Sequence, residues 1–138
     1  MTEELKEDLT TIVREFLAAM EMNAVDEAMD LVTDDIAWRN SSLPTVHGAK
    51  RLRAMLEQMV ARRIRFRADF HHIAADGNIV LTDRTDYLGI GPVESSFWVC
   101  GTFEIRDGRI AVWDDHFSWE NLLRGTVKGL FRAVVPGQ

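Results

Sequence analysis

The spacing of hydrophobic residues changes once along this chain of 138 residues, near residue 64. Before this point, apolar residues recur every three or four positions over residues 5–20 and 52–59, which is the period of an amphipathic helix. Over residues 64–70 they alternate with arginine and aspartate, which is the period of a strand with one buried face. Helices followed by a run of strands predict an α+β fold, in which the helices pack on one side of a curved sheet.

Turn signals divide the second half of the chain into strands. The Asp-Gly pairs at 76–77 and 107–108 are typical of tight hairpins. Together with the loop after residue 88 they delimit alternating segments at 78–88, 95–105 and 109–119. We therefore predict three antiparallel strands joined in series, with the middle strand between the other two.

The remaining elements complete a cone-shaped domain. A short helix is predicted over residues 25–32, a short strand over 36–40 and a last helix over 122–131. We expect one domain spanning residues 1–138, with a curved mixed or antiparallel sheet wrapped by helices, as in a cystatin-like α+β roll. Such a cone has an interior that can hold a ligand in an apolar pocket.

Composition excludes several classes of function. Hydrophobic residues make up 46% of the chain, which is enough for a core, and the formal net charge of −6 argues against binding to nucleic acid. We expect no membrane partner, because no apolar run approaches the roughly 20 residues of a membrane span. The N-terminus lacks a signal-peptide pattern, so we expect a cytoplasmic protein. A single cysteine, Cys100, allows no internal disulfide and provides no metal-binding cluster.

Charged residues fall on strand faces that otherwise carry core residues. In the first of the three strands, Arg84 and Asp86 share a face with valine and leucine, and in the last strand Asp115 shares a face with two aromatic residues. Trp38 and Asn40 also lie two positions apart in the early strand. If the aromatic faces turn inward, all of these polar groups enter an apolar cavity. Charged groups are rarely buried unless they are paired, so the pattern requires an explanation.

Two carboxylates and one guanidinium can divide the roles of acid and base. Arg84 and Asp86 lie roughly 7 Å apart along their strand, and Asp115 lies roughly 10 Å across the sheet, with the space above Gly101 between them. A guanidinium can bind both carboxylates, and in an apolar site one carboxyl keeps its proton while the other stays charged. This arrangement predicts push–pull addition of water. A structural Asp–Arg–Asp network and a solvated, outward-facing arrangement remain open alternatives.

At these residues the sequence resembles the limonene-1,2-epoxide hydrolase family, within the nuclear-transport-factor-2-like superfamily of α+β cones. The resemblance is carried by VLTDRTDYL, by FWVCGTFEIRDGRIAVWDDHF and, more loosely, by IAWRN. It covers most of the chain, and the sequence is most similar to the mycobacterial branch of the family.

The resemblance implies a mechanism and assigns roles to five residues. Asp115 would be the general base for a water molecule that Asn40 also holds, and Trp38 stands where the family has a second water-binding residue, a tyrosine. Asp86 would protonate the epoxide oxygen, and Arg84 would bridge the two carboxylates. The implied reaction converts a lipophilic small-molecule epoxide into a vicinal diol in one step, without metal or cofactor, in a homodimeric enzyme.

The sequence departs from the family pattern at three positions. Trp38 replaces the tyrosine, and because an indole N–H donates but cannot accept, the orientation of the water can change. Asp114 replaces an arginine and His116 replaces a tyrosine, and both are expected to face away from the cavity. The expected apolar wall of the substrate pocket comprises Met29, Val32, Leu88, Phe97, Val99, Trp113 and Phe117.

Two other functions compete with this interpretation. A non-catalytic ligand-binding protein on the same cone is favoured by Trp38, which weakens the water site. A ketosteroid-isomerase-like or polyketide-cyclase-like enzyme would need an aspartate base and an oxyanion donor, which two carboxylates and an arginine fit less well. A metal site at His71 and His72 is not expected, because neighbouring residues of a strand point to opposite faces.

Overall fold

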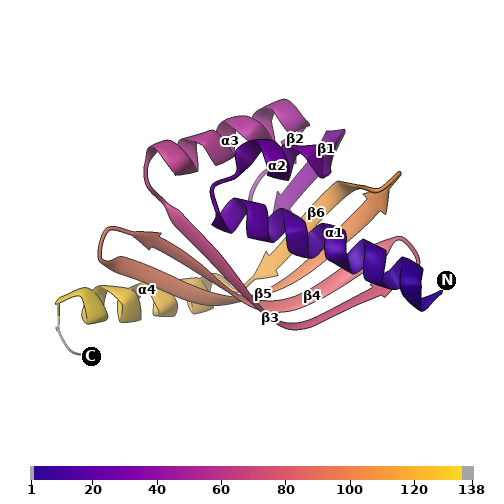
Figure 1. The fold of residues 1–138 in the computed structure, drawn as a ribbon. Coiled ribbons are helices and arrows are strands. Elements are labelled where there is room, and N and C mark those ends of the chain that lie inside the picture. Colours follow the sequence, from indigo (N-terminus) through magenta and orange to yellow (C-terminus); the bar gives the residue numbers. More distant parts are fainter. Residues whose placement is uncertain (1, 135–138) are drawn as a thin grey trace.

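A computed structural model describes residues 2–134, and these residues form an open, curved sheet with helices on its inner face (Figure 1). This arrangement confirms the predicted α+β fold. The helices are α1 (Glu3–Glu21), α2 (Val25–Asp30), α3 (Ala49–Ala61) and α4 (Trp119–Val134). The strands are β1 (Val32–Asn40), β2 (Val46–His47), β3 (Arg65–Asp76), β4 (Ile79–Ile90), β5 (Val93–Arg106) and β6 (Arg109–Phe117).

The sheet is mixed, with strand order β2-β1-β6-β5-β4-β3. Strands β3 to β6 are sequential antiparallel neighbours, which confirms the predicted series of hairpins. Asp107 and Gly108 both adopt positive φ at the β5–β6 turn, as a tight hairpin of this kind requires. Strand β1 lies parallel to β6 and so joins the first half of the chain to its last strand.

The early strand is longer than its sequence pattern indicates. Strand β1 begins at Val32, which was expected to end the second helix, and α2 ends at Asp30. The cause is tertiary pairing, because Val32 lies opposite Ile110 and the Ile110 N–H donates to the Leu31 carbonyl. The two-residue strand β2 has no pattern of its own in the sequence, and it forms by antiparallel pairing with β1.

A β-bulge in β3 reverses one expectation. The register shifts between Phe70 and His72, so His71 and His72 both reach the outer face instead of opposite faces. His71 Nε2 lies 2.8 Å from Thr85 Oγ1, and His72 Nδ1 lies 3.0 Å from Asp83 Oδ2. The extra residue of a bulge breaks the alternation on which the expectation rested.

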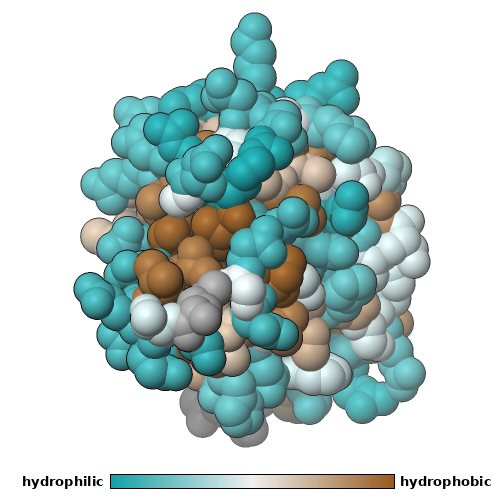
Figure 2. All heavy atoms as spheres, turned by 90° about the vertical axis from the view of Figure 1, so that its right-hand side faces the viewer, coloured by the Kyte–Doolittle hydropathy of each residue, from teal (hydrophilic) through white to brown (hydrophobic). Residues whose placement is uncertain are grey.

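Three helices cover the inner face of the sheet and build the core. Helix α1 is capped by Thr2, whose Oγ1 accepts the Leu5 N–H at 3.2 Å, and it buries Val13, Phe16 and Leu17. Helix α3 buries Leu52 and Leu56 against the same side. Viewed from the end that carries the N-terminus, hydrophobic residues gather near the middle of the surface and are surrounded by hydrophilic ones (Figure 2).

Helix α4 packs separately, against the first half of β5 (Figure 1). Strand β6 pairs with β5 only from Val99 onward, and the Trp98 N–H donates to Asn121 Oδ1 of α4 at 3.1 Å. A Cβ atom at Gly125 or Gly129 would collide with the backbone of Ser96 or Glu94. The two glycines therefore let the helix lie directly on the strand.

Candidate active site

A cavity of about 280 Å³ opens between the inner face of the sheet and the helices. Its wall is almost entirely apolar, with Asp86, Asp115 and Asn40 as the polar exceptions and the indole of Trp38 beside them. The lining residues are Met20, Trp38, Asn40, Leu43, Met59, Phe66, Asp86, Leu88, Phe97, Val99, Trp113, Asp115, Phe117, Trp119 and Leu122.

The three predicted charged residues meet at this wall. Arg84 is 0% exposed, Asp86 4% and Asp115 5%, so the inward-facing arrangement is the one that forms. Arg84 Nε and Nη2 donate to the two oxygens of Asp86 at 2.8 and 3.0 Å, and Nη2 also donates to Asp115 Oδ2 at 2.6 Å. Arg84 itself does not line the cavity. It therefore binds both carboxylates from behind.

The register of the sheet explains why distant residues converge. Thr82 of β4 pairs with Gly101 of β5, Gly101 with Asp115 of β6, and Asp115 with Asn40 of β1. These four residues form one row across four strands. A Cβ atom at Gly101 would lie 2.7 Å from both Asp115 Oδ1 and Thr82 Oγ1, and would also overlap the Arg84 guanidinium. The absence of a side chain at Gly101 provides the space through which Arg84 reaches Asp115.

Burial and mutual charge shift the acidity of the cluster. Burial raises the pKa of Asp115 to about 6, even though the charge of Arg84 opposes the shift, and the negative charge of Asp86 adds to it. Burial also raises the pKa of Asp86, against the hydrogen bonds from Arg84. Burial disfavours the charged form of Arg84. The charges and hydrogen bonds of the two carboxylates together have the larger effect, and they raise the guanidinium pKa above its ordinary value. Arg84 thus stays charged while the carboxyls compete for protons.

Three buried polar atoms of residues that line the cavity have no hydrogen-bond partner among residues 2–134. They are Asp115 Oδ1, an acceptor, and the indole nitrogens Trp38 Nε1 and Trp113 Nε1, both donors. Trp38 stacks on Trp113, with ring centroids 4.7 Å apart and an interplanar angle of 14°. A buried acceptor and a buried donor on one cavity wall are groups that a water molecule can satisfy.

The apolar wall was predicted only in part. Five expected members line the cavity, namely Leu88, Phe97, Val99, Trp113 and Phe117. Met29 and Val32 do not, which corrects the expectation: Val32 is buried in the core at the start of β1, and Met29 packs against that core.

Six wall residues were missed, and each lies on a helix, in a loop or near the start of β3. Their hydrophobic spacing was visible, but spacing alone does not distinguish core from cavity. The missed residues are Met20, Leu43, Met59, Phe66, Trp119 and Leu122.

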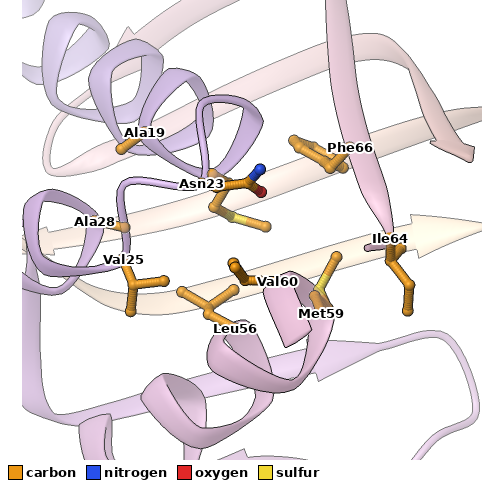
Figure 3. Close-up of a pocket in the computed structure, with 10 residues that line it drawn as sticks. Ala19, Asn23, Val25, Ala28, Leu56, Met59, Val60, Ile64 and Phe66 are labelled. Atoms are coloured by element: carbon orange, nitrogen blue, oxygen red, sulfur yellow. The ribbon is translucent and has the colours of Figure 1, made fainter. Parts of the chain in front are cut away.

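A second, nearly filled apolar depression lies where α1, α2 and α3 meet (Figure 3). Its volume is only about 10 Å³, and Met20, Met59 and Phe66 line both it and the larger cavity. The space is too small for a ligand, and these three side chains separate it from the cavity.

The two substituted neighbours of Asp115 face outward, as expected. His116 is exposed and Asp114 is partly exposed, and His116 Nε2 lies 3.4 Å from Asp114 Oδ1. Neither residue lines the cavity. Within residues 2–134, no group of three or more His, Cys, Asp or Glu side chains is arranged to hold a metal ion. No helix in that part of the chain is long and apolar enough to cross a membrane.

Comparison with known proteins identifies relatives over nearly the whole chain. Residues 7–128 match the limonene-1,2-epoxide hydrolase catalytic domain. Epoxide hydrolase EphG of Mycobacterium tuberculosis is 40% identical over 124 residues, which cover 90% of this chain and 83% of that protein. The structure of an M. tuberculosis epoxide hydrolase of the same type superposes with a TM-score of 0.91 at 37% identity, covering 96% of this chain and 98% of the other.

More distant structures share the fold alone. A putative polyketide cyclase from Xanthomonas campestris pv. campestris has a TM-score of 0.73 at 15% identity, and the match covers 87% of this chain and 97% of that chain.

Proposed function

The chain belongs to the limonene-1,2-epoxide hydrolase family and is an epoxide hydrolase; we propose that residues 1–138 act as one catalytic domain that adds water to a lipophilic epoxide in a single acid–base step. One observation carries the proposal. A single buried guanidinium, that of Arg84, binds two carboxylates that both line an apolar cavity.

Asp115 is the base in this proposal. Its Oδ1 has no partner among the described residues, and it pairs across the sheet with Asn40, which also lines the cavity. A water molecule that donates to Oδ1 is held by the Asn40 amide and by the indole N–H of Trp38. A pKa of about 6 leaves Asp115 ionised at neutral pH, yet basic enough to accept a proton.

Asp86 is the acid. Burial raises its pKa, but in the free protein both of its oxygens accept from Arg84. A proton on Asp86 therefore displaces one of these contacts and gives the carboxyl a donor for the epoxide oxygen. In the reaction the water oxygen bonds to an epoxide carbon, the C–O bond of that carbon breaks, and the released oxygen takes the Asp86 proton. Asp115 takes the proton of the water, and the product is a vicinal diol.

The test is hydrolysis of terpene, styrene and fatty-acid epoxides in water enriched in ¹⁸O, with product analysis by mass spectrometry. We expect diols that contain one heavy oxygen atom. The Asp115→Asn and Asp86→Asn variants should lose roughly 10²–10⁴-fold or more in kcat while remaining folded, because each removes a proton-transfer group. The outward-facing neighbour supplies a matched control, and Asp114→Asn should retain wild-type turnover. Diol formation at the wild-type rate by either variant would show that the roles are wrong.

The same experiment separates the competing functions. Binding of the epoxides without diol formation would favour a ligand-binding protein. Proton exchange next to a ketone, without incorporation of heavy oxygen, would favour an isomerase.

Three further properties belong to the proposal: the family supports the second and third, and the N-terminal sequence pattern supports the first. The enzyme is cytoplasmic, works without metal or cofactor, and is a homodimer. Dialysis against a chelator should leave activity unchanged, and cell fractionation should recover the protein in the cytoplasmic fraction.

The homodimer is supported by Leu123, Val127 and Phe131 of α4, which recur every four positions and are each more than half exposed. Light scattering should give twice the chain mass, and Val127→Lys should lower it; a wild-type mass of one chain would contradict the dimer.

A further inference from the structure

Thr82 is a buried polar residue to which the reaction above gives no role. It lies on the inner face of β4, two residues before Arg84, and is 4% exposed. It does not line the cavity, so it cannot touch a bound substrate. Its hydroxyl nevertheless contacts the catalytic cluster, because Arg84 Nη1 lies 3.0 Å from Thr82 Oγ1.

The direction of each hydrogen bond at this hydroxyl is fixed. A guanidinium has no acceptor, so Arg84 Nη1 must donate and Thr82 Oγ1 must accept. The hydroxyl has one hydrogen of its own, and Oγ1 donates it to the Gly101 carbonyl at 3.2 Å. The main chain of β5 thus orients the hydroxyl, and the hydroxyl in turn orients the guanidinium.

All three guanidinium nitrogens are thereby held from different sides. Nε binds Asp86, Nη2 binds both carboxylates, and Nη1 binds Thr82. The guanidinium is planar, so a hydrogen bond at Nη1 fixes the orientation of the whole plane. That orientation sets the distances from Nη2 to Asp86 and to Asp115. Without the Thr82 hydroxyl, Nη1 loses its hydrogen-bond acceptor, and the guanidinium plane is free to tilt about its contacts with Asp86.

We propose that Thr82 is a positioning residue that fixes the Arg84 plane so that one guanidinium serves both carboxylates at once. This inference rests on the proposed epoxide hydrolysis for its effect on rate, but its geometric basis is independent of substrate. Arg84 and Asp86 are the charged groups that act on Asp115. Loosening Arg84 therefore withdraws the positive charge that favours ionised Asp115, and the base becomes harder to ionise.

The experiment compares Thr82→Val, which keeps the shape and removes the hydroxyl, with Thr82→Ser, which keeps the hydroxyl. Thr85→Val is the control, since Thr85 lies on the same strand and contacts His71 on the outer face. Thr82→Val should lower kcat roughly tenfold with little change in KM, and should move the acidic limb of the pH profile upward by about half a pH unit or more. Thr82→Ser should keep the wild-type kcat and the wild-type position of the acidic limb, and Thr85→Val should match the wild type in both.

A second readout needs no substrate. Carboxyl ¹³C NMR titration of Asp115 in wild type and Thr82→Val should show the same upward shift in the midpoint. If the wild type makes no diol but this shift is present, the hydrolase proposal fails and the positioning role stands. An unchanged midpoint and pH profile in Thr82→Val, or a rate loss that Thr82→Ser does not restore, would overturn the positioning role. Should Thr82→Val not fold, Thr82→Cys replaces it with the same expected shift, because a thiol is a weak acceptor.

Discussion

At the scale of single residues, the site depends on what is absent at Gly101 as much as on the charged groups. The Arg84 guanidinium, Asp115 Oδ1 and Thr82 Oγ1 all lie where a Cβ atom on Gly101 would be. All three side chains are buried, and Arg84 donates both to Thr82 Oγ1 and to the other oxygen of Asp115, so they cannot move aside without breaking a hydrogen bond. A methyl group at this position would therefore separate Asp115, the proposed base, from the Arg84 cation.

We predict that Gly101→Ala destroys activity and destabilises the fold. The free energy of unfolding should fall by roughly 1–3 kcal/mol, because overpacking forces buried groups to shift, and turnover should fall at least as far as in the acid–base variants. Gly89→Ala on the neighbouring strand is the comparison, since the nearest atoms to its Cβ belong to the exposed side chain of Arg65, which can move aside at the cost of one hydrogen bond to the Gly91 carbonyl. Urea titration and diol formation measure both effects. Equal losses in the two variants would contradict this role of Gly101.

The acidity of Asp115 predicts the pH dependence of turnover. The base works only when ionised, and its pKa is raised to about 6. kcat/KM should therefore be low in acid and rise with pH along a limb centred near pH 6, and it should fall again at higher pH as Asp86 loses the proton that it must donate. Initial rates between pH 4 and 8 in buffers of constant ionic strength measure this limb. A plateau that already extends down to pH 4 would show that Asp115 is not the base.

Much of this residue-scale arrangement could be predicted from the sequence. Alternation placed Arg84 and Asp86 on one face of their strand and Asp115 with the aromatic face of its own. Alternation cannot say which face is inward, because that depends on where the helices pack. The role of Thr82 was also out of reach, since a threonine among valines and leucines gives no signal until the position of Arg84 Nη1 is known.

At the scale of elements, α4 connects the stability of the fold with the shape of the cavity. Trp119 and Leu122 at its start line the cavity, while Gly125 and Gly129 hold the helix directly on β5. A larger residue at either glycine would push the helix outward and move this part of the wall.

We predict that Gly125→Ala destabilises the protein and raises KM. In an ordinary helix this change stabilises by about 1 kcal/mol, so a loss of stability is diagnostic of the collision with the Ser96 backbone. Lys128→Ala, at an exposed position of the same helix, should be close to neutral in both measurements. Chemical denaturation and Michaelis–Menten analysis test the pair. A more stable Gly125→Ala with unchanged KM would show that the close packing is not needed.

The elements that the sequence did not predict are those made by distant partners. Strand β2 exists because β1 pairs with it. The start of β1 is strand rather than helix because Val32 pairs with Ile110. The bulge near His72 likewise has no local signal. The hairpins of β4, β5 and β6 were predictable because their turns and alternation are local.

At the scale of the whole molecule, the cavity is a space enclosed by contributions from almost every element. Residues from α1, α3, α4 and the loop before β2 line it together with the sheet. Helical spacing in the sequence gave the apolar stripes, but whether a stripe fills a core or faces a cavity depends on the curvature of the sheet. For this reason Met29 was wrongly expected in the wall and Met20 was missed.

Burying the Asp86–Arg84–Asp115 cluster has a cost in stability that depends on pH. The pKa of Asp115 is raised from an ordinary value of 3.8 to about 6, so the folded state binds a proton more tightly than the unfolded state. Its contribution is most favourable below about pH 4 and is lost as pH rises through 6. Relative to Asp115→Asn, the wild type should therefore lose on the order of 2–3 kcal/mol of unfolding free energy between pH 4 and 7. Urea titrations of both proteins across this range test the sign; a wild type that gains stability relative to the variant would contradict it.

The parallel pairing of β1 with β6 places Asn40 beside Asp115, one from the first third of the chain and the other from its last. Contacts between segments so remote in sequence form slowly, because the entropy of closing a long loop is lost before the contacts contribute any favourable energy. During synthesis, Asn40 is therefore made long before the strand that completes its surroundings. A nascent or half-renatured chain can hold its hairpins and still lack the water site, so recovered catalysis would report the last stage of assembly.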